Sequence, residues 1–198
     1  MPDSERSQVS EPQEPGAEAA PHPETADGVA LLPIDAPSPQ DRDAVVALFA
    51  EDLADLRLPV DLDALRNVFA ALVADPRAVL LVVRDGPATM SANGDVTPGE
   101  AVGVLVASRV PSVKFSGWSM WIEELYVGRR ARQKGLGRAL VLRLLEVARR
   151  EGVKGIDLEA YHGNAPAALL YRSLGFRRLG RERFYYRLEW EQDLQGEP

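Results

Sequence analysis

The segment from Gly128 to Arg138 combines residue types that bind phosphate. It holds five basic side chains and three glycines in eleven positions, between a predicted strand and a predicted helix. Backbone N–H groups at the start of a helix attract anions, and glycine lets a ligand approach the backbone closely. The segment therefore predicts a pyrophosphate site. Taken alone, it also fits a tight strand-to-helix turn with solvated arginines.

The same segment excludes two common phosphate-binding motifs. It lacks the Gly-Lys-Ser/Thr ending of a P-loop. A dinucleotide-binding loop has a third glycine three residues after the second. Here Gly135-Leu136-Gly137 is followed by Ala139 and Leu140, so that glycine is missing. The predicted site therefore binds its anion in a different way.

Hydrophobic periodicity predicts the elements that hold this segment. The strongest helix covers residues 135–151, where Leu136, Leu140 and Leu144 share one face and Gly152 is placed to cap the end. Strands are predicted at 29–34, 78–83, 101–107, 119–127, 156–160 and 184–190, and a loop at 86–99. Three further helices are predicted: one that opens at 38–40 and stops at Pro59, one from about 61 to before Pro76, and one that is capped by Asn164 and runs to about 174. This order predicts a mixed α/β layer fold without internal repeats.

Composition separates an N-terminal tail from one domain. Residues 1–28 hold seven acidic residues, one basic residue, five prolines and no aromatic residue, so we expect them to be disordered and residues 29–198 to form a single domain. The tail lacks the pattern of a secretory signal, and no apolar stretch is long enough for a membrane span. We therefore expect a soluble, cytoplasmic protein without membrane contact.

Charge and cysteine content narrow the function classes. The net charge of -7 argues against a dedicated nucleic-acid binder, and the absence of cysteine excludes disulfides, a cysteine nucleophile and a thiolate metal site. No spaced cluster of histidine and acidic residues suggests a metal. Residues 29–109 hold 12 acidic and 6 basic side chains, whereas residues 110–198 hold 11 and 16. This split fits an anionic ligand in the second half and a cationic one in the first, or simply uneven surface charge.

Two motifs resemble those of the GNAT superfamily of N-acetyltransferases. Arg132-x-x-Gly135-x-Gly137, after a strand ending Leu125-Tyr126-Val127, is similar to the acetyl-CoA signature R/Q-x-x-G-x-G/A. Asn164-x-x-Ala167-x-x-x-Tyr171-x-x-x-Gly175-Phe176 is similar to the helix beside CoA and the turn after it. The resemblance covers about residues 29–190. It implies a mixed, mostly antiparallel sheet flanked by helices, with two central strands splayed apart.

The resemblance implies acetyl-CoA as co-substrate and no metal. The pantetheine arm would lie between the splayed strands, and the pyrophosphate would lie at the turn, with Arg132, Lys134 and Arg138 as cations. The residues expected to contact acetyl-CoA are Leu125, Tyr126, Val127, Arg132, Gln133, Lys134, Gly135, Leu136, Gly137, Arg138, Ala139, Asn164 and Ala167.

The implied chemistry is attack of an amine on a thioester. Without cysteine, we expect direct transfer in a ternary complex. An amine with a pKa near 10.4 needs about 4.6 kcal/mol to expose its lone pair at pH 7, so a base must help. Alternation puts Glu123 on the face of Leu125 and Val127 and Glu124 on the other. Some polyamine-acetylating relatives carry an acid at the position matching Glu123, so Glu123 is favoured as the base and Glu124 is the second choice. Tyr171 matches the tyrosine that protonates the leaving thiolate in many relatives.

The acceptor remains open between classes. A small cationic amine, polyamine-like or aminoglycoside-like, is favoured by the acidic first half, in which Asp52, Asp55, Asp61 and Asp63 either attract the acceptor or form a solvated helical face. Protein or peptide acetylation and a non-catalytic acyl-CoA-binding regulatory module are the alternatives. A homodimer is also compatible with the sequence. His162 and the aromatic residues Trp118, Trp121, Tyr185 and Tyr186 are weaker candidates for the acceptor site.

Overall fold

A computed structural model describes residues 34–38, 41–86, 89–90, 96–97, 99–161 and 163–179. Several predictions lie outside these residues: the tail at 1–28, most of the strand at 29–34, the strand at 184–190 with Tyr185 and Tyr186, and His162. No helix within the described part is long and apolar enough to cross a membrane.

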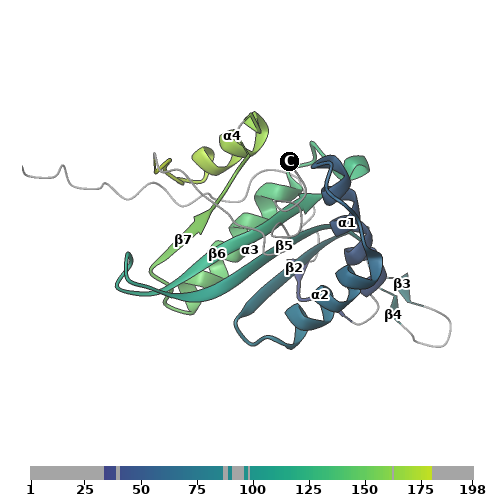
Figure 1. Ribbon diagram of the computed structural model, residues 1–198, viewed down its shortest axis with the longest axis horizontal. Coiled ribbons are helices and arrows are strands. Elements are labelled where there is room, and N and C mark those ends of the chain that lie inside the picture. Colours follow the sequence, from purple (N-terminus) through teal and green to yellow (C-terminus); the bar gives the residue numbers. More distant parts are fainter. Residues whose placement is uncertain are drawn as a thin grey trace, which may run out of the picture. The chain divides into compact units, whose positions relative to one another are not determined.

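The described chain forms a mixed sheet with helices on both faces (Figure 1). The sheet has the order β1-β2-β5-β6-β7, in which only β6 and β7 are parallel, and β3 and β4 form a separate pair. The elements are β1 (Ile34–Asp35), α1 (Arg42–Asp55), α2 (Leu62–Ala74), β2 (Ala78–Asp85), β3 (Thr89–Met90), β4 (Val96–Thr97), β5 (Glu100–Ser112), β6 (Gly117–Val127), the 3-10 turn η2 (Arg129–Ala131), α3 (Leu136–Arg150), β7 (Gly155–Leu158) and α4 (Ala165–Ser173). This confirms the predicted fold class.

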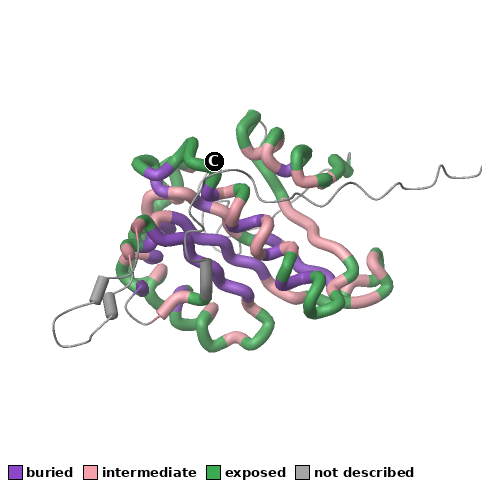
Figure 2. The backbone as a smooth tube through the Cα atoms, turned by 180° about the vertical axis from the view of Figure 1, so that it is seen from behind, coloured by how far each residue is buried: buried purple, intermediate pink, exposed green. Residues whose placement is uncertain are grey.

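Two apolar clusters fill the spaces between the sheet and its helices. On one face, α1 and α2 pack Val45, Phe49 and Phe69 against inward side chains of β2, β5 and β6. On the other face, α3 packs Leu140 and Leu144 against the same three strands. Figure 2 shows the buried backbone running along the central strands. The 3.6-residue and two-residue periodicities of the sequence thus map onto these layers.

A buried ion pair anchors the start of α1. Asp41, the residue before this helix, accepts a hydrogen bond from Arg84 Nη2 at 2.7 Å and one from the Ser38 hydroxyl at 2.7 Å. The side chains of Arg84 and Asp41 are only 4% and 6% exposed. The pair therefore ties the first turn of α1 to the end of β2.

The strands β6 and β7 separate halfway along β6. Their parallel pairing runs from Ser119 with Gly155 to Ile122 with Leu158, and β6 then continues alone on this side to Val127. The chain passes from β6 through α3 to β7, so the carboxyl end of β6 and the start of α3 lie together. This is the predicted splaying of the central strands.

Four details differ from the sequence-based expectation. The strand predicted at 101–107 continues to Ser112 in β5, where it pairs with β6. The predicted loop at 86–99 contains the short strands β3 and β4. Strand β7 ends at Leu158, two residues before the predicted end, because its partner β6 has moved away. The turn η2 was not predicted, and it fills the connection between β6 and α3.

Candidate active site

The free part of β6 presents backbone groups toward the opening. The Gly128 N–H donates to the Val102 carbonyl of β5 at 2.9 Å. Because backbone groups alternate sides along a strand, those of Tyr126 face β5, and those of Leu125 and Val127 face the side where β7 has separated. The splayed edge can therefore bind an extended, amide-containing ligand as an added strand.

The turn before α3 offers a set of amides for an anion. In the part of the chain that the structure describes, the N–H groups of residues 135–138 have no backbone acceptor. Gly135 has a φ of 75° and begins α3, and Gln133 also has a positive φ. Several amides at the N-terminus of a 15-residue helix form the kind of cradle that holds a pyrophosphate. These residues therefore fit a pyrophosphate group.

Gly137 lies where β6, α3 and α4 meet. A Cβ atom at this position would be 3.6 Å from Leu170 Cδ2 and 3.9 Å from Val127 Cγ2, which are ordinary contacts. At Gly135 a Cβ would meet nothing within 4 Å, so the backbone conformation rather than space requires glycine there. The two glycines of the motif thus have different physical roles.

Gly135→Val is expected to weaken CoA binding by about 5- to 30-fold. A residue with a Cβ atom costs roughly 1–2 kcal/mol in this left-handed conformation, so the turn would be held less well in the shape that presents its amides. Isothermal titration with CoA measures the change. Gly137→Ala is the matched control, because its new methyl group fits, and its dissociation constant should stay close to that of the parent chain. Equal affinities for both variants would contradict this role of Gly135.

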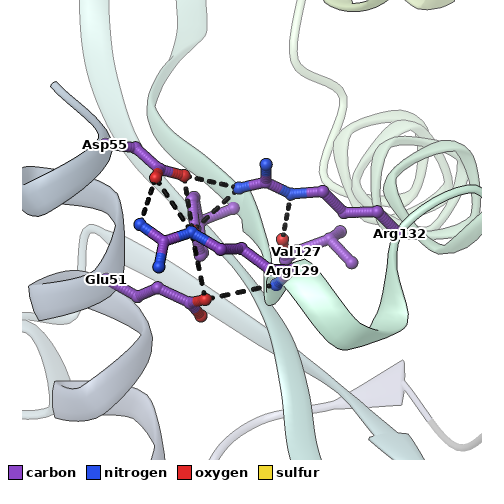
Figure 3. Close-up of polar contacts among 6 residues, drawn as sticks. Glu51, Asp55, Val127, Arg129 and Arg132 are labelled. Carbon is purple, nitrogen blue, oxygen red and sulfur yellow. Dashed lines mark hydrogen bonds and ion pairs between the residues drawn. The ribbon is translucent and has the colours of Figure 1, made fainter.

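The basic side chains of the turn point to different partners. The Arg132 guanidinium reaches across to α1, where its Nη2 donates to Asp55 at 2.7 Å (Figure 3). Arg138 donates to the Ser173 hydroxyl of α4 at 2.8 Å, and Lys134 Nζ lies 4.0 Å from an Asp85 oxygen. Of the three predicted phosphate cations, Arg132 thus donates a hydrogen bond to a carboxylate of another element, and Lys134 forms a longer ion pair with one.

A bulge in β6 sets the positions of Glu123 and Glu124. Val106 of β5 pairs with Glu124 and Ala107 pairs with Ile122, so Glu123 has no partner on β5. An extra residue interrupts the alternation of faces. Ile122 and Leu125 consequently both pack with the α3 cluster, although strict alternation would separate them. Glu123 is exposed, whereas Glu124 is half-buried.

Glu124 shares its surroundings with Asp52 of α1. The two carboxyl groups are close enough for each to affect the pKa of the other, and Glu124 Oε1 accepts the Leu125 N–H at 3.0 Å. Burial and then the neighbouring Asp52 charge raise the pKa of Glu124 to about 7. Burial raises the pKa of Asp52 as well. A pair of carboxyl groups that shares one proton near neutrality suits proton transfer.

A helix cap fixes Tyr171. Gly175, with a φ of 88°, ends α4, and the Phe176 N–H donates to the Tyr171 carbonyl at 3.0 Å. The two rings contact each other at a centroid distance of 5.7 Å. The spacing Tyr171-x-x-x-Gly175-Phe176 is therefore a Schellman cap with its usual apolar contact. Burial, with a smaller contribution from Glu124, raises the pKa of Tyr171 to about 12 and keeps the hydroxyl protonated.

Asn164 caps the other end of α4, as predicted. Its side-chain oxygen accepts the Ala167 N–H at 3.2 Å. Sequence reasoning did not single out Asp52 as a partner of Glu124 or Asp55 as a partner of the turn. The signal was the i, i+3 spacing of two acidic residues in an amphipathic helix, which by itself also fits a solvated face. Among the described residues, no group of histidine and acidic side chains could hold a metal.

Comparison with known proteins identifies the family of this chain. A model of the acetyltransferase (GNAT) family matches residues 47–176, which is well over half of the chain. The chain belongs to the GNAT acetyltransferase family.

Two relatives are similar over part of their length. The N-alpha-acetyltransferase RimI of Mycobacterium tuberculosis is 37% identical over 86 residues, which are 43% of this chain and 49% of that protein. The streptothricin acetyltransferase of Streptomyces lavendulae is 35% identical over 77 residues, 38% of this chain and 41% of that protein. The chain thus spans less than half the length of these two relatives.

Solved structures share the fold. A transcriptional regulator from Bacillus halodurans has a TM-score of 0.65 at 23% identity, covering 79% of this chain and 99% of that one. At this level of identity the likeness shows the fold alone.

Proposed function

We propose that this chain transfers an acetyl group from acetyl-CoA to a primary amine by direct transfer in a ternary complex. The observation that carries the proposal is the separation of β6 from β7 beside the turn before α3. Glu124 lies on this part of β6, and its charge is close enough to affect the pKa of Tyr171. Membership of the GNAT family supports acetyl-CoA as the donor. A cytoplasmic location belongs to the same proposal.

The donor would bind along the free part of β6. The Leu125 carbonyl and the Val127 N–H face this opening, whereas the Leu125 N–H donates to Glu124 and the Val127 carbonyl accepts from Arg132. The turn offers its N–H groups to the pyrophosphate. A helix N-terminus contributes only about 0.3–1 kcal/mol toward an anion, so several amide hydrogen bonds must share the binding. Lys134 and Arg138 are the cations nearest in sequence to these amides.

We infer that Glu124, rather than Glu123, is the base. Glu124 has a pKa near neutrality, so at pH 7 a large fraction is ionised and able to take a proton from the acceptor amine. The new nitrogen–carbon bond forms as the carbon–sulfur bond of the thioester breaks, and the amine proton passes to Glu124. Asp52 holds Glu124 in place and shares its proton. Glu123 stays the second candidate because it is exposed at the bulge.

Tyr171 would stabilise the leaving sulfur. With a pKa of about 12 its hydroxyl is a poor acid toward a thiolate, whose conjugate thiol has a pKa near 8.5. It can still donate a hydrogen bond to the negative charge that develops on sulfur. The proposed role is therefore hydrogen-bond donation, followed by proton uptake from solvent.

Tyr171→Phe is expected to lower kcat by about 10- to 100-fold, because it removes one hydrogen bond to a charged group in the transition state. The ring remains to pack on Phe176, so CoA affinity should be retained. Steady-state rates and CoA titration of the same preparation separate the two effects. Normal turnover with intact CoA binding would reject this role.

The acceptor is proposed to be a small cationic amine. Glu123 and Asp52 add negative charge around Glu124, which favours a cation at this end of the opening. The partial likeness to RimI supports a protein N-terminus as the second candidate. Incubation with acetyl-CoA and two panels, one of polyamines and aminoglycosides and one of short peptides, followed by mass spectrometry of the products, distinguishes these classes. CoA binding without any product would favour the non-catalytic module.

A further inference from the structure

The end of α1 forms a network with the turn that precedes α3 (Figure 3). Asp55, the last residue of α1, accepts hydrogen bonds from three side chains, one at the end of β6 and two in the connection to α3. The distances from its oxygens are 2.9 Å to Tyr126 Oη, 3.0 Å to Arg129 Nε and 2.7 Å to Arg132 Nη2. One carboxylate thus contacts the end of the strand, the 3-10 turn and the first residue of the acetyl-CoA motif.

Arg132 uses its whole guanidinium group within this network. Its Nε donates to the Val127 carbonyl at 3.0 Å, and its Nη2 also donates to Tyr126 Oη at 2.8 Å. The group lies over the Tyr126 ring, 5.1 Å from the centroid. These contacts direct the side chain toward α1, so the guanidinium connects two elements instead of standing beside the amides of residues 133–138.

A second set of contacts fixes the start of the connection against α1. Glu51 accepts the Arg129 N–H at 3.4 Å. A Cβ atom on Gly128 would come within 3.2 Å of Leu48 Cδ2, so the backbone approaches the helix closely. Leu48, Glu51 and Asp55 are spaced three and four residues apart and therefore lie on one face of α1.

The charge of Asp55 is constant across the working pH range. Hydrogen bonds from Arg129, then Arg132 and Tyr126, hold the pKa of its carboxyl well below the usual range. The network therefore remains ionised when Glu124 and Asp52 change protonation. Asp52 lies three residues before Asp55 on the same helix, so α1 contacts both the proposed base and the phosphate-binding turn.

We propose that Asp55 is a positioning residue, which holds the turn at residues 128–132 through Arg129 and Arg132 and so aligns the CoA-binding amides with Glu124. Arg132 is then a structural link of the phosphate site and not a ligand of the phosphate. This inference rests on the proposed function.

The test uses CoA itself as the probe. Asp55→Asn keeps the shape of the side chain and removes its charge, and we expect CoA affinity to fall about tenfold, as for the loss of one charged hydrogen bond. The KM for acetyl-CoA should rise by a similar factor, with kcat changed much less. Asp43→Asn, in the exposed first turn of the same helix, is the matched control and should bind CoA like the parent chain.

Two readouts separate positioning from a general loss of structure. If Asp55 only stabilised the fold, titration would give fewer binding sites with an unchanged dissociation constant, and the proposal would be overturned. Combining Asp55→Asn with Arg132→Gln should weaken binding no more than Asp55→Asn alone, because the link from Asp55 to Arg132 is already broken in that variant. Losses that multiply in the double variant would show that Arg132 contacts the phosphate independently, which also contradicts the proposal.

The parent chain distinguishes this inference from the proposed function. Absence of CoA binding by the parent would remove the proposed function and the inference with it. Binding by the parent that is equally tight in Asp55→Asn would overturn the role of Asp55 alone.

Discussion

Replacing Glu124 with glutamine is expected to lower kcat for acetyl transfer by about 10²- to 10⁴-fold, the usual contribution of a general base. Glutamine keeps the shape and the ability to accept the Leu125 N–H, but it cannot take a proton. CoA affinity should therefore stay unchanged. Glu123→Gln is the matched control on the preceding residue, and we expect its rate to be close to that of the parent chain. The reverse ranking would return the role of base to Glu123.

The pH dependence of acetyl transfer by the parent chain provides a second measurement. Burial beside Asp52 raises the pKa of Glu124 from 4.5 to about 7. Activity should increase as the pH rises through this value, because the base must be ionised. Asp52→Asn removes the neighbouring charge, so we expect the rise in activity to move to lower pH. An unmoved profile would contradict the pairing of Asp52 with Glu124.

As the pH rises, the free energy of unfolding should change in the direction opposite to activity. Between about pH 4.5 and about pH 7 the folded chain holds a proton on Glu124 that the unfolded chain has released. The free energy of unfolding contributed by this group is therefore lost as the pH rises through this window. Urea unfolding at about pH 5 and about pH 8 should show a smaller loss in Glu124→Gln than in the parent. This readout needs no acceptor.

Asp41→Ala is expected to have the largest effect on stability, lowering the free energy of unfolding by about 3–5 kcal/mol. The change takes a carboxylate away from a buried guanidinium, whose side chain is only 4% exposed. Urea unfolding measures it. Because Asp41 also begins the helix that carries Asp52 and Asp55, residual activity should fall with the folded fraction.

An apolar replacement of Asp41 and Arg84 together tests whether the unpaired buried charge causes this loss of stability. In Asp41→Leu combined with Arg84→Met no buried charge remains, so the double variant should be more stable than Asp41→Ala. Asp43→Ala, two residues further along and exposed, should leave the unfolding midpoint unchanged. A double variant as unstable as the single one would mean that shape, and not charge, determines the loss.

The motifs of the second half were predictable because their causes are local. Gly135 is needed for a positive φ at a helix start, and Gly175 with Phe176 forms a cap on Tyr171. Asn164 likewise accepts an amide only three residues ahead. Requirements of this kind are contained in short stretches of sequence.

The face of the sheet on which Glu123 and Glu124 each lie could not be predicted in the same way. They depend on a bulge created by the pairing of β6 with β5, which alternation within one strand does not reveal. The partner of Arg132 is likewise set by tertiary structure, since Asp55 lies 77 residues away in the sequence. Residues 129–132 are rich in arginine, and only the packing of α1 decides which of them face a carboxylate.

The central claim is that this chain acetylates an amine with Glu124 as the base. It is tested most directly by following thiol release from acetyl-CoA across the amine panels, with the parent chain and Glu124→Gln side by side. We predict amine-dependent release by the parent, and release slower by about 10²-fold or more in Glu124→Gln, although both bind CoA equally well. Equal release by the two proteins, or no release with any amine despite CoA binding, would contradict the account.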